Sequence, residues 1–160
     1  MSDPKTNRSS SRLAAVQALY EYEFGDKTID AIAREFLSGE TGSEVIRENE
    51  FTQEETFVPV IPAEPTLFST ILSSYADNRD EINKLVDSSF NEEWPAEHVE
   101  MTLKAILRAG TAELTGTSTP EAIIITEYLD VTKSFYDGPE IKVVNGILDK
   151  IAKKLRGKAK

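Results

Sequence analysis

The sequence contains no cysteine and a single histidine, His98, among its 160 residues. The lack of cysteine excludes disulfide scaffolds, zinc ribbons, iron–sulfur clusters and thiol catalysis, and one histidine nearly excludes histidine metal sites and catalytic triads. No apolar run approaches the roughly 20 residues of a membrane-spanning helix. The polar residues 1–11 lack the apolar centre of a secretory signal. We therefore expect a soluble, cytoplasmic protein.

Motifs that carry catalysis or bind nucleotides are also missing. The chain has no P-loop, no G-x-G-x-x-G, no G-x-S-x-G and no H-E-x-x-H pattern. The acidic pairs Glu54-Glu55 and Glu92-Glu93 would place neighbouring carboxylates on different faces of a helix, whereas acid–base catalysis needs them to converge. We expect no enzymatic activity, no metal site and no cofactor.

Charge is unevenly distributed along the chain. The formal net charge is −10, but residues 1–12 carry +2, residues 150–160 carry +6 and residues 13–149 carry −18. The acidic body argues against nucleic-acid binding, whereas the two basic ends could bind a polyanion if they converged on one surface. A solvated lysine-rich tail is the alternative interpretation of the C-terminal end.

Apolar residues repeat at helical spacing along most of the chain, and strand-like alternation is scarce. The pattern predicts seven helices, at about residues 12–24, 29–38, 66–76, 80–90, 95–116, 120–135 and 139–155. Whether the third and fourth form one kinked helix stays open, because residues 77–81 contain neither proline nor glycine. The run Ile123–Ile125 also fits a strand, but its length and the preceding cap favour a helix.

Caps and glycines give these helices their expected ends. Ser10 or Ser11 is expected to cap the first helix, Thr28 the second and Thr119 the sixth, and Pro95 is expected to begin the fifth. Gly110 lies on the apolar stripe of the fifth helix, where a missing side chain would let another helix approach closely.

Residues 38–62 interrupt the helical pattern with an acidic, polar segment that we interpret as a surface excursion. This insertion suggests an N-terminal subdomain at residues 1–78, with a basic arm, and a C-terminal subdomain at residues 79–160, with a basic tail. The predicted fold is therefore an all-α bundle of about seven helices in two packed subdomains.

Four stretches in order carry a family resemblance: RLAAVQALY (residues 12–20), AILRAGTAEL (105–114), TPEAIIITEYLDVTKSF (119–135) and VNGILDKIAKKL (144–155). Together they resemble the NusB family of bacterial transcription antitermination factors. The resemblance implies an all-α fold of two helical subdomains and a non-catalytic function. Members bind the boxA element of nascent ribosomal RNA as single-stranded RNA, together with the small-subunit ribosomal protein NusE. They join the elongating RNA polymerase complex and suppress premature termination, and some self-associate, so a homodimer is one expectation.

The resemblance and the residue types together predict an RNA-contacting set: Arg8, Arg12, Gln17, Tyr20, Tyr136, Lys142 and Asn145. Two departures from the family pattern weaken this set. Serines occupy positions 9–11 of a segment that is typically rich in arginine, and Val143 occupies a position where many members have an aromatic residue. Valine offers no ring for a base to stack on, so Tyr136 is a hypothetical substitute.

Several of these residues also have a structural alternative. Tyr20 has the spacing of a core residue, and Asn145 could satisfy a buried backbone group. Gly146 suggests close approach of another helix or of a partner's backbone, because glycine destabilises a helix interior. Arg108, Glu113 and Glu127 are expected to tie neighbouring helices or loops together.

The acidic body suits a different partner from the basic ends. Ribosomal proteins are usually strongly basic, so we expect the negative surface to bind NusE and the basic N-terminal and Lys142 region to bind RNA. The alternative is a protein-interaction module of the same fold that has weakened or lost boxA binding.

Overall fold

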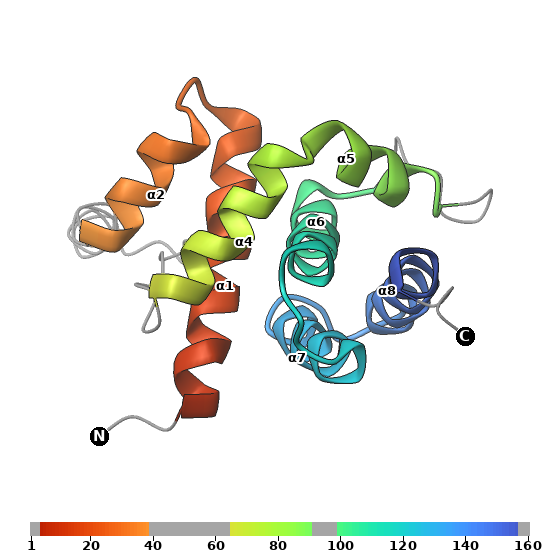
Figure 1. Cartoon of the computed structure of the whole chain (residues 1–160). Coiled ribbons are helices and arrows are strands. Elements are labelled where there is room, and N and C mark those ends of the chain that lie inside the picture. The colour runs from red at the N-terminus through yellow and green to blue at the C-terminus, as the bar shows by residue number, and fades with distance from the viewer. Residues whose placement is uncertain (1–3, 39–64, 91–98, 157–160) are drawn as a thin grey trace.

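The computed structural model describes residues 4–38, 65–90 and 99–156, with side chains from residue 8 onward. All regular secondary structure in these ranges is helical (Figure 1). The helices are α1 (Pro4–Phe24), α2 (Ile29–Ser38), α4 (Pro65–Asp77), α5 (Arg79–Asp87), α6 (Met101–Gly116), α7 (Glu121–Lys133) and α8 (Glu140–Arg156). The all-α prediction is confirmed. None of these helices combines the length and apolarity needed to cross a membrane.

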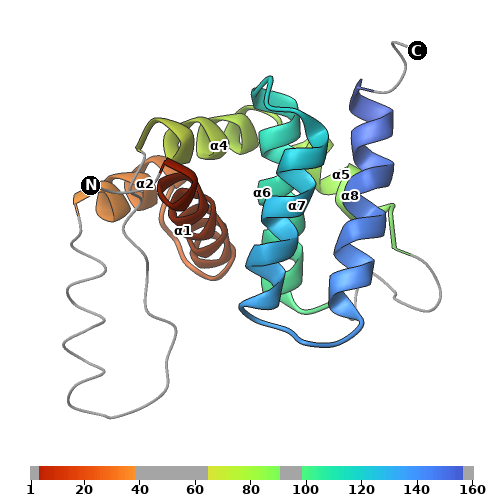
Figure 2. The ribbon, with the colours of Figure 1, turned by 90° about the horizontal axis from the view of Figure 1, so that it is seen from below.

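Helix α6 lies at the centre of the fold. It contacts α1, α4 and α5 as well as α7 and α8. Helices α6, α7 and α8 run side by side, and α1 lies at a steep angle to them beside α6 and α7 (Figures 1 and 2). Because α6 packs against helices from both halves of the chain, one core runs through the described residues; the division at residue 78 stays a prediction.

The core is built from the apolar faces of these helices. Its largest fully buried side chains include Phe68, Tyr75, Ile106 and Leu148. A Cβ placed on Gly110 would lie 3.1 Å and 3.2 Å from the two terminal methyl groups of Leu148. The predicted close approach of another helix at Gly110 is therefore confirmed, and the approaching helix is α8.

Three predicted helix starts are wrong. Helix α1 begins at Pro4, because proline suits a first helical position, so Ser10 and Ser11 lie inside the helix and cap nothing. Helix α6 begins at Met101, after an extended Glu100 (φ −62°, ψ 147°), so no helix continues into it from Pro95, which lies outside the described residues. The N-cap of α7 is Pro120, whose ψ of 139° is extended, and not Thr119.

The connection between α4 and α5 resolves the question left open by the sequence. Asn78 has φ −125° and ψ 27°, and the chain leaves the helical path there. Its backbone N–H and its side-chain amide both donate to the carbonyl of Ser74, at 3.1 Å and 3.0 Å. The third and fourth helices are therefore separate.

Two other polar contacts shape the connections. The Thr28 hydroxyl accepts a hydrogen bond from the backbone N–H of Ala31 at 3.1 Å, which confirms the predicted cap of α2. Arg156 donates to the carbonyls of Leu114 (3.2 Å and 3.0 Å), Thr117 (2.7 Å) and Thr119 (2.6 Å). The basic end of α8 thus holds the α6–α7 connection through Arg156, whereas the acidic insertion and the last four residues lie outside the described ranges.

Candidate nucleic-acid interface

Arg12, a predicted RNA contact, lies inside the protein with 2% of its side chain exposed. Its Nε donates to Oε1 of Glu113 at 2.9 Å and its Nη2 donates to Oε2 at 2.7 Å. Its Nη1 lies 3.5 Å from Oε1 of Glu127. Arg12 therefore joins α1 to α6 and α7, and it is not available to a ligand in this structure.

Two further hydroxyl groups complete this buried network. The Tyr128 hydroxyl donates to Oε1 of Glu113 at 2.9 Å, and Ser9 Oγ donates to Oε1 of Glu127 at 2.9 Å. Burial lowers the pKa of Arg12, but its hydrogen bond and charge interaction with Glu113 more than offset this effect, so the net shift is upward. Burial, followed by the charge of Glu113, raises the pKa of Tyr128 well above its ordinary value. Tyr128 therefore stays a neutral donor.

The predicted structural roles of three charged residues are confirmed. Glu113 and Glu127 are buried and connect α6 and α7 to α1. Arg108 on α6 donates through Nη1 to Oε1 of Glu23 near the end of α1, at 2.9 Å. All three side chains fix the position of α1 against the rest of the fold.

The other predicted residues of α1 divide by exposure. Arg8 is exposed near the N-terminus of the helix, whereas Gln17 is buried, with 4% exposed. Tyr20 is half-buried, and its ring centroid lies 4.9 Å from that of Phe24, which is 65% exposed. Among the four predicted RNA contacts on α1, Arg8 is thus the one whose side chain is exposed, and Tyr20 exposes part of its ring.

The predicted residues near α8 lie closer to the surface. Lys142 and Asn145 are exposed on the first turns of the helix, so Asn145 does not serve a buried backbone group. Tyr136 is half-buried, and its hydroxyl donates to Oε1 of Glu100 at 2.7 Å. Burial and this bond to Glu100 raise the pKa of Tyr136. Tyr136 thus ties the α7–α8 connection to the start of α6 while keeping part of its ring accessible.

Helix α7 separates the two groups of surface residues. It contacts both α1 and α8 and lies between them (Figure 2). The structure therefore brings Lys142 and Asn145 together but does not place Arg8 beside them. Ile123 on α7 has the spacing of a core residue in the sequence, yet it is 50% exposed, because its neighbour Ile124 takes the buried position. Helical spacing did not distinguish the two adjacent isoleucines.

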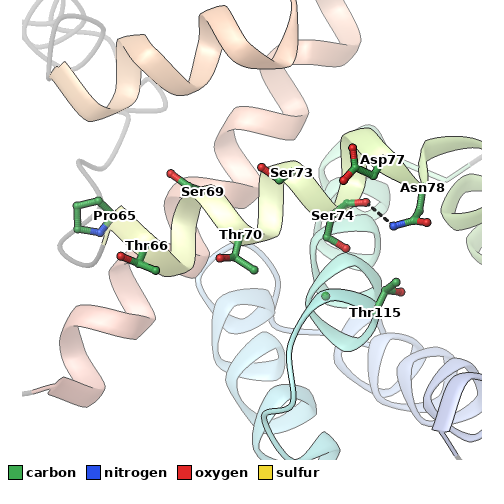
Figure 3. A pocket seen from close by; sticks show the side chains of 10 residues that line it. Pro65, Thr66, Ser69, Thr70, Ser73, Ser74, Asp77, Asn78 and Thr115 are labelled. Atoms are coloured by element: carbon green, nitrogen blue, oxygen red, sulfur yellow. Dashed lines mark hydrogen bonds between the residues drawn. The ribbon is translucent and has the colours of Figure 1, made fainter.

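A groove between α4 and α6 is lined mainly by hydroxyl groups (Figure 3). Its volume is about 590 Å³, and Thr66, Ser69, Thr70, Ser73 and Thr115 line it. Ser74 also lines it and donates to the carbonyl of Ala112 at 2.7 Å. No basic side chain is among its lining residues, so it offers little to a phosphate.

A larger groove lies between the end of α1, α2 and α4. Its volume is about 1100 Å³, and its acidic lining residues are Glu23, Asp26, Asp30 and Asp77. Three basic side chains also line it: Lys27, which pairs with Glu35 at 2.7 Å, Arg79, which bonds to the Tyr22 hydroxyl, and the exposed Arg34. Its four acidic side chains outnumber the three basic ones by one, so the groove is slightly negative. Within the described ranges, no group of three or more acidic or histidine side chains could hold a metal ion.

Comparison with known proteins relates this fold to one family. The NusB family model matches residues 9–153. Transcription antitermination protein NusB of Agrobacterium fabrum is 37% identical over 158 residues, which cover 98% of this chain and 90% of that protein. Its counterpart in Sinorhizobium fredii is 36% identical over 151 residues, covering 94% and 88%. A solved structure of T. maritima NusB has a TM-score of 0.68 and 25% identity, covering 99% of this chain and 97% of that one. The chain belongs to the NusB family.

Proposed function

We propose that this protein is a non-catalytic RNA-binding factor in transcription antitermination. It binds the boxA element of nascent ribosomal RNA as single-stranded RNA, together with ribosomal protein NusE, and joins the elongating RNA polymerase complex in the cytoplasm. The observation that carries this proposal is the extent of the family match, because the relatives named transcription antitermination protein cover nearly the whole chain.

The RNA surface in this proposal runs from Arg8 on α1 across α7 to Lys142 and Asn145 on α8. Each of these three side chains is exposed, and α7 lies between the two helices that carry them. The partly accessible rings of Tyr20 and Tyr136 can stack on bases. Arg12 and Gln17 support α1 from the inside, so we leave them out of the contacts.

NusE binds a different face in this proposal. The acidic side chains Asp26, Asp30, Asp77, Asp80 and Glu81 line two grooves at the end of α1, along α2 and at the α4–α5 junction. A strongly basic ribosomal protein would be attracted there, and a negative patch would speed its association. Separate faces allow RNA and protein to bind at the same time.

The alternative is a protein-interaction module with weakened boxA binding. Two observations favour it. Val143 is half-buried against the core and offers no ring, and the Ser9 hydroxyl is bonded to Glu127. A surface that neutralises fewer phosphates predicts weaker binding and a smaller salt dependence, because each neutralised phosphate of a single strand adds about 0.7 to the salt slope.

Binding of labelled boxA RNA, compared with a scrambled RNA of the same composition, tests the proposal. The measurement is made at two salt concentrations, with and without NusE. Preference for boxA that increases with NusE supports the RNA-binding factor. Binding of NusE without preference for boxA supports the protein-interaction module. The variant Val143→Phe restores an aromatic ring at this position. If this face contacts the bases, the ring should strengthen boxA binding by about 1–3 kcal/mol.

A further inference from the structure

Gly146 lies in the middle of α8, and the fold gives no reason for a glycine there. Its position is exposed, and a Cβ placed on it would meet no atom within 4 Å apart from its chain neighbours and the adjoining backbone of α8. In contrast, a Cβ on Gly110 would contact Leu148 and a Cβ on Gly116 would contact Ser74. Glycine destabilises a helix interior relative to alanine. Gly146 therefore lowers the stability of α8 without easing any contact among the described residues.

The side chains around Gly146 make this face positive. Lys142 and Lys150 lie four residues before and after Gly146, and Lys153 lies seven residues after it, so all three share its side of the helix. All three are exposed, as is Lys154 beside them. Asp149 is the acidic residue on this face, and it pairs with Lys153 at 3.2 Å. Lys142, Lys150 and Lys154 form no ion pair with another described residue.

We propose that the outer face of α8, from Lys142 past Gly146 to Lys154, binds the phosphates of single-stranded RNA that flanks boxA. This inference rests on the proposed function and extends its RNA surface along the helix. From Lys142 to Lys154 the helix rises about 18 Å, which is longer than the stretch of helix between Lys142 and Asn145. The lysines supply the charge, and the missing Cβ lets the sugar-phosphate backbone approach the helix closely.

Charge favours RNA over a protein on this face. A basic ribosomal protein would be repelled by the net positive charge that the four lysines and Asp149 give this face, whereas a polyanion is attracted to it. The groove between α1, α2 and α4 lies on other helices, and its four acidic side chains outnumber its three basic ones. The α8 face is thus the phosphate-binding face in this proposal, and this groove is the protein-binding face.

Two RNAs and two variants of the full chain test the inference. One RNA carries boxA alone, and the other carries boxA extended at both ends by uridines. Wild type should bind the extended RNA more tightly and with a steeper salt dependence. The double variant Lys150→Gln, Lys154→Gln should lower the salt slope on the extended RNA by about 1.4, which corresponds to two neutralised phosphates. Lys84→Gln, an exposed lysine on α5, is the matched control and should change neither slope.

Gly146→Ala distinguishes a loss of RNA binding from a loss of folding, because it should stabilise the fold and weaken RNA binding. The melting temperature should rise by roughly 2–4 °C, while affinity for the extended RNA falls more than affinity for boxA alone. Unchanged affinity for the extended RNA in both variants would overturn the inference, as would a wild type that gains nothing from the extension. In either case wild type still binds boxA. A wild type that binds neither RNA would instead remove the proposed function, and this inference with it.

Discussion

Arg12 on α1 and Glu113 on α6 form a two-point ion pair, with 2.9 Å between Nε and Oε1 and 2.7 Å between Nη2 and Oε2. The side chains are only 2% and 0% exposed, although the residues lie 101 positions apart in the sequence. An arginine that the family resemblance assigns to RNA therefore holds α1 in place. It positions the helix from which Arg8 reaches the surface.

Removing one partner of this ion pair should destabilise the fold strongly. Glu113→Gln keeps the size of the side chain but leaves the Arg12 guanidinium buried without its main counter-charge. We expect a loss of about 3–5 kcal/mol in the free energy of unfolding, measured by urea denaturation. Lys133→Gln, which breaks the exposed pair with Asp130, is the control and should change stability by less than about 0.5 kcal/mol. Equally small effects of both substitutions would show that the buried charge of Arg12 does not need Glu113 as its partner.

Tyr128 should make stability depend on pH in the alkaline range. Its pKa in the folded state lies well above the ordinary value of 10.0, mainly because it is buried. The stabilisation that comes from this raised pKa is fully present below pH 10. It is lost as the pH rises above 10, since the unfolded chain then releases a proton that the folded chain keeps. Stability should fall by up to about 1.4 kcal/mol per pH unit for each such tyrosine.

Tyr128→Phe isolates this contribution. The variant should be less stable at neutral pH by about 1.5–3 kcal/mol, because the hydrogen bond to charged Glu113 is removed. Its stability should also decline less steeply than that of wild type above pH 10. Tyr75 and Tyr136, whose pKa values are raised as well, would supply the remaining slope. Identical slopes in urea titrations of the two proteins would contradict the assignment.

Gly116 should tolerate alanine poorly. An added Cβ would lie 2.8 Å from Cβ and 2.9 Å from Oγ of Ser74, and Ser74 is fixed by its bond to the Ala112 carbonyl. Because a Cβ cannot rotate away, α4 would have to move from α6. We expect Gly116→Ala to cost about 1–3 kcal/mol in thermal or chemical denaturation. The same change at Gly146 should raise the free energy of unfolding by up to about 1 kcal/mol. A stabilising effect at both positions would show that α4 and α6 can move apart at little cost.

Association with NusE should weaken as salt is added. The acidic side chains near α2 and the α4–α5 junction attract a basic partner, and salt screens this attraction over about 8–10 Å. Asp26→Asn together with Asp30→Asn should slow association, measured by stopped-flow or surface binding, while leaving boxA binding unchanged. An association rate that is independent of ionic strength would show that NusE does not use this face.

The sequence predicted which parts of the chain are helical better than it predicted where each helix begins. The Thr28 cap, the α6 end at Gly116 and the close approach at Gly110 all follow from local chemistry, and each is confirmed. The start of α1 was misplaced because Ser10 and Ser11 are good caps, whereas the helix begins earlier, at Pro4, and both serines lie inside it.

The candidate site was harder to predict for a similar reason. Charge and resemblance selected Arg8 and Lys142 alongside Arg12 and Gln17, but only tertiary packing decides which of them reach the surface. Burial of Arg12 depends on two glutamates from α6 and α7, far along the chain. Gly146 shows the opposite case. The sequence marked it as unusual, but only the structure shows that its missing side chain faces open space.

Transcription by RNA polymerase through a terminator placed downstream of boxA tests the proposed function most directly. Full-length transcript is measured with and without this protein, in the presence of NusE and the rest of the elongation complex. The proposal predicts that the protein increases read-through, and that scrambling boxA removes the increase. Read-through that is unchanged by the protein, or that rises equally on the scrambled template, would contradict a boxA-dependent antitermination factor.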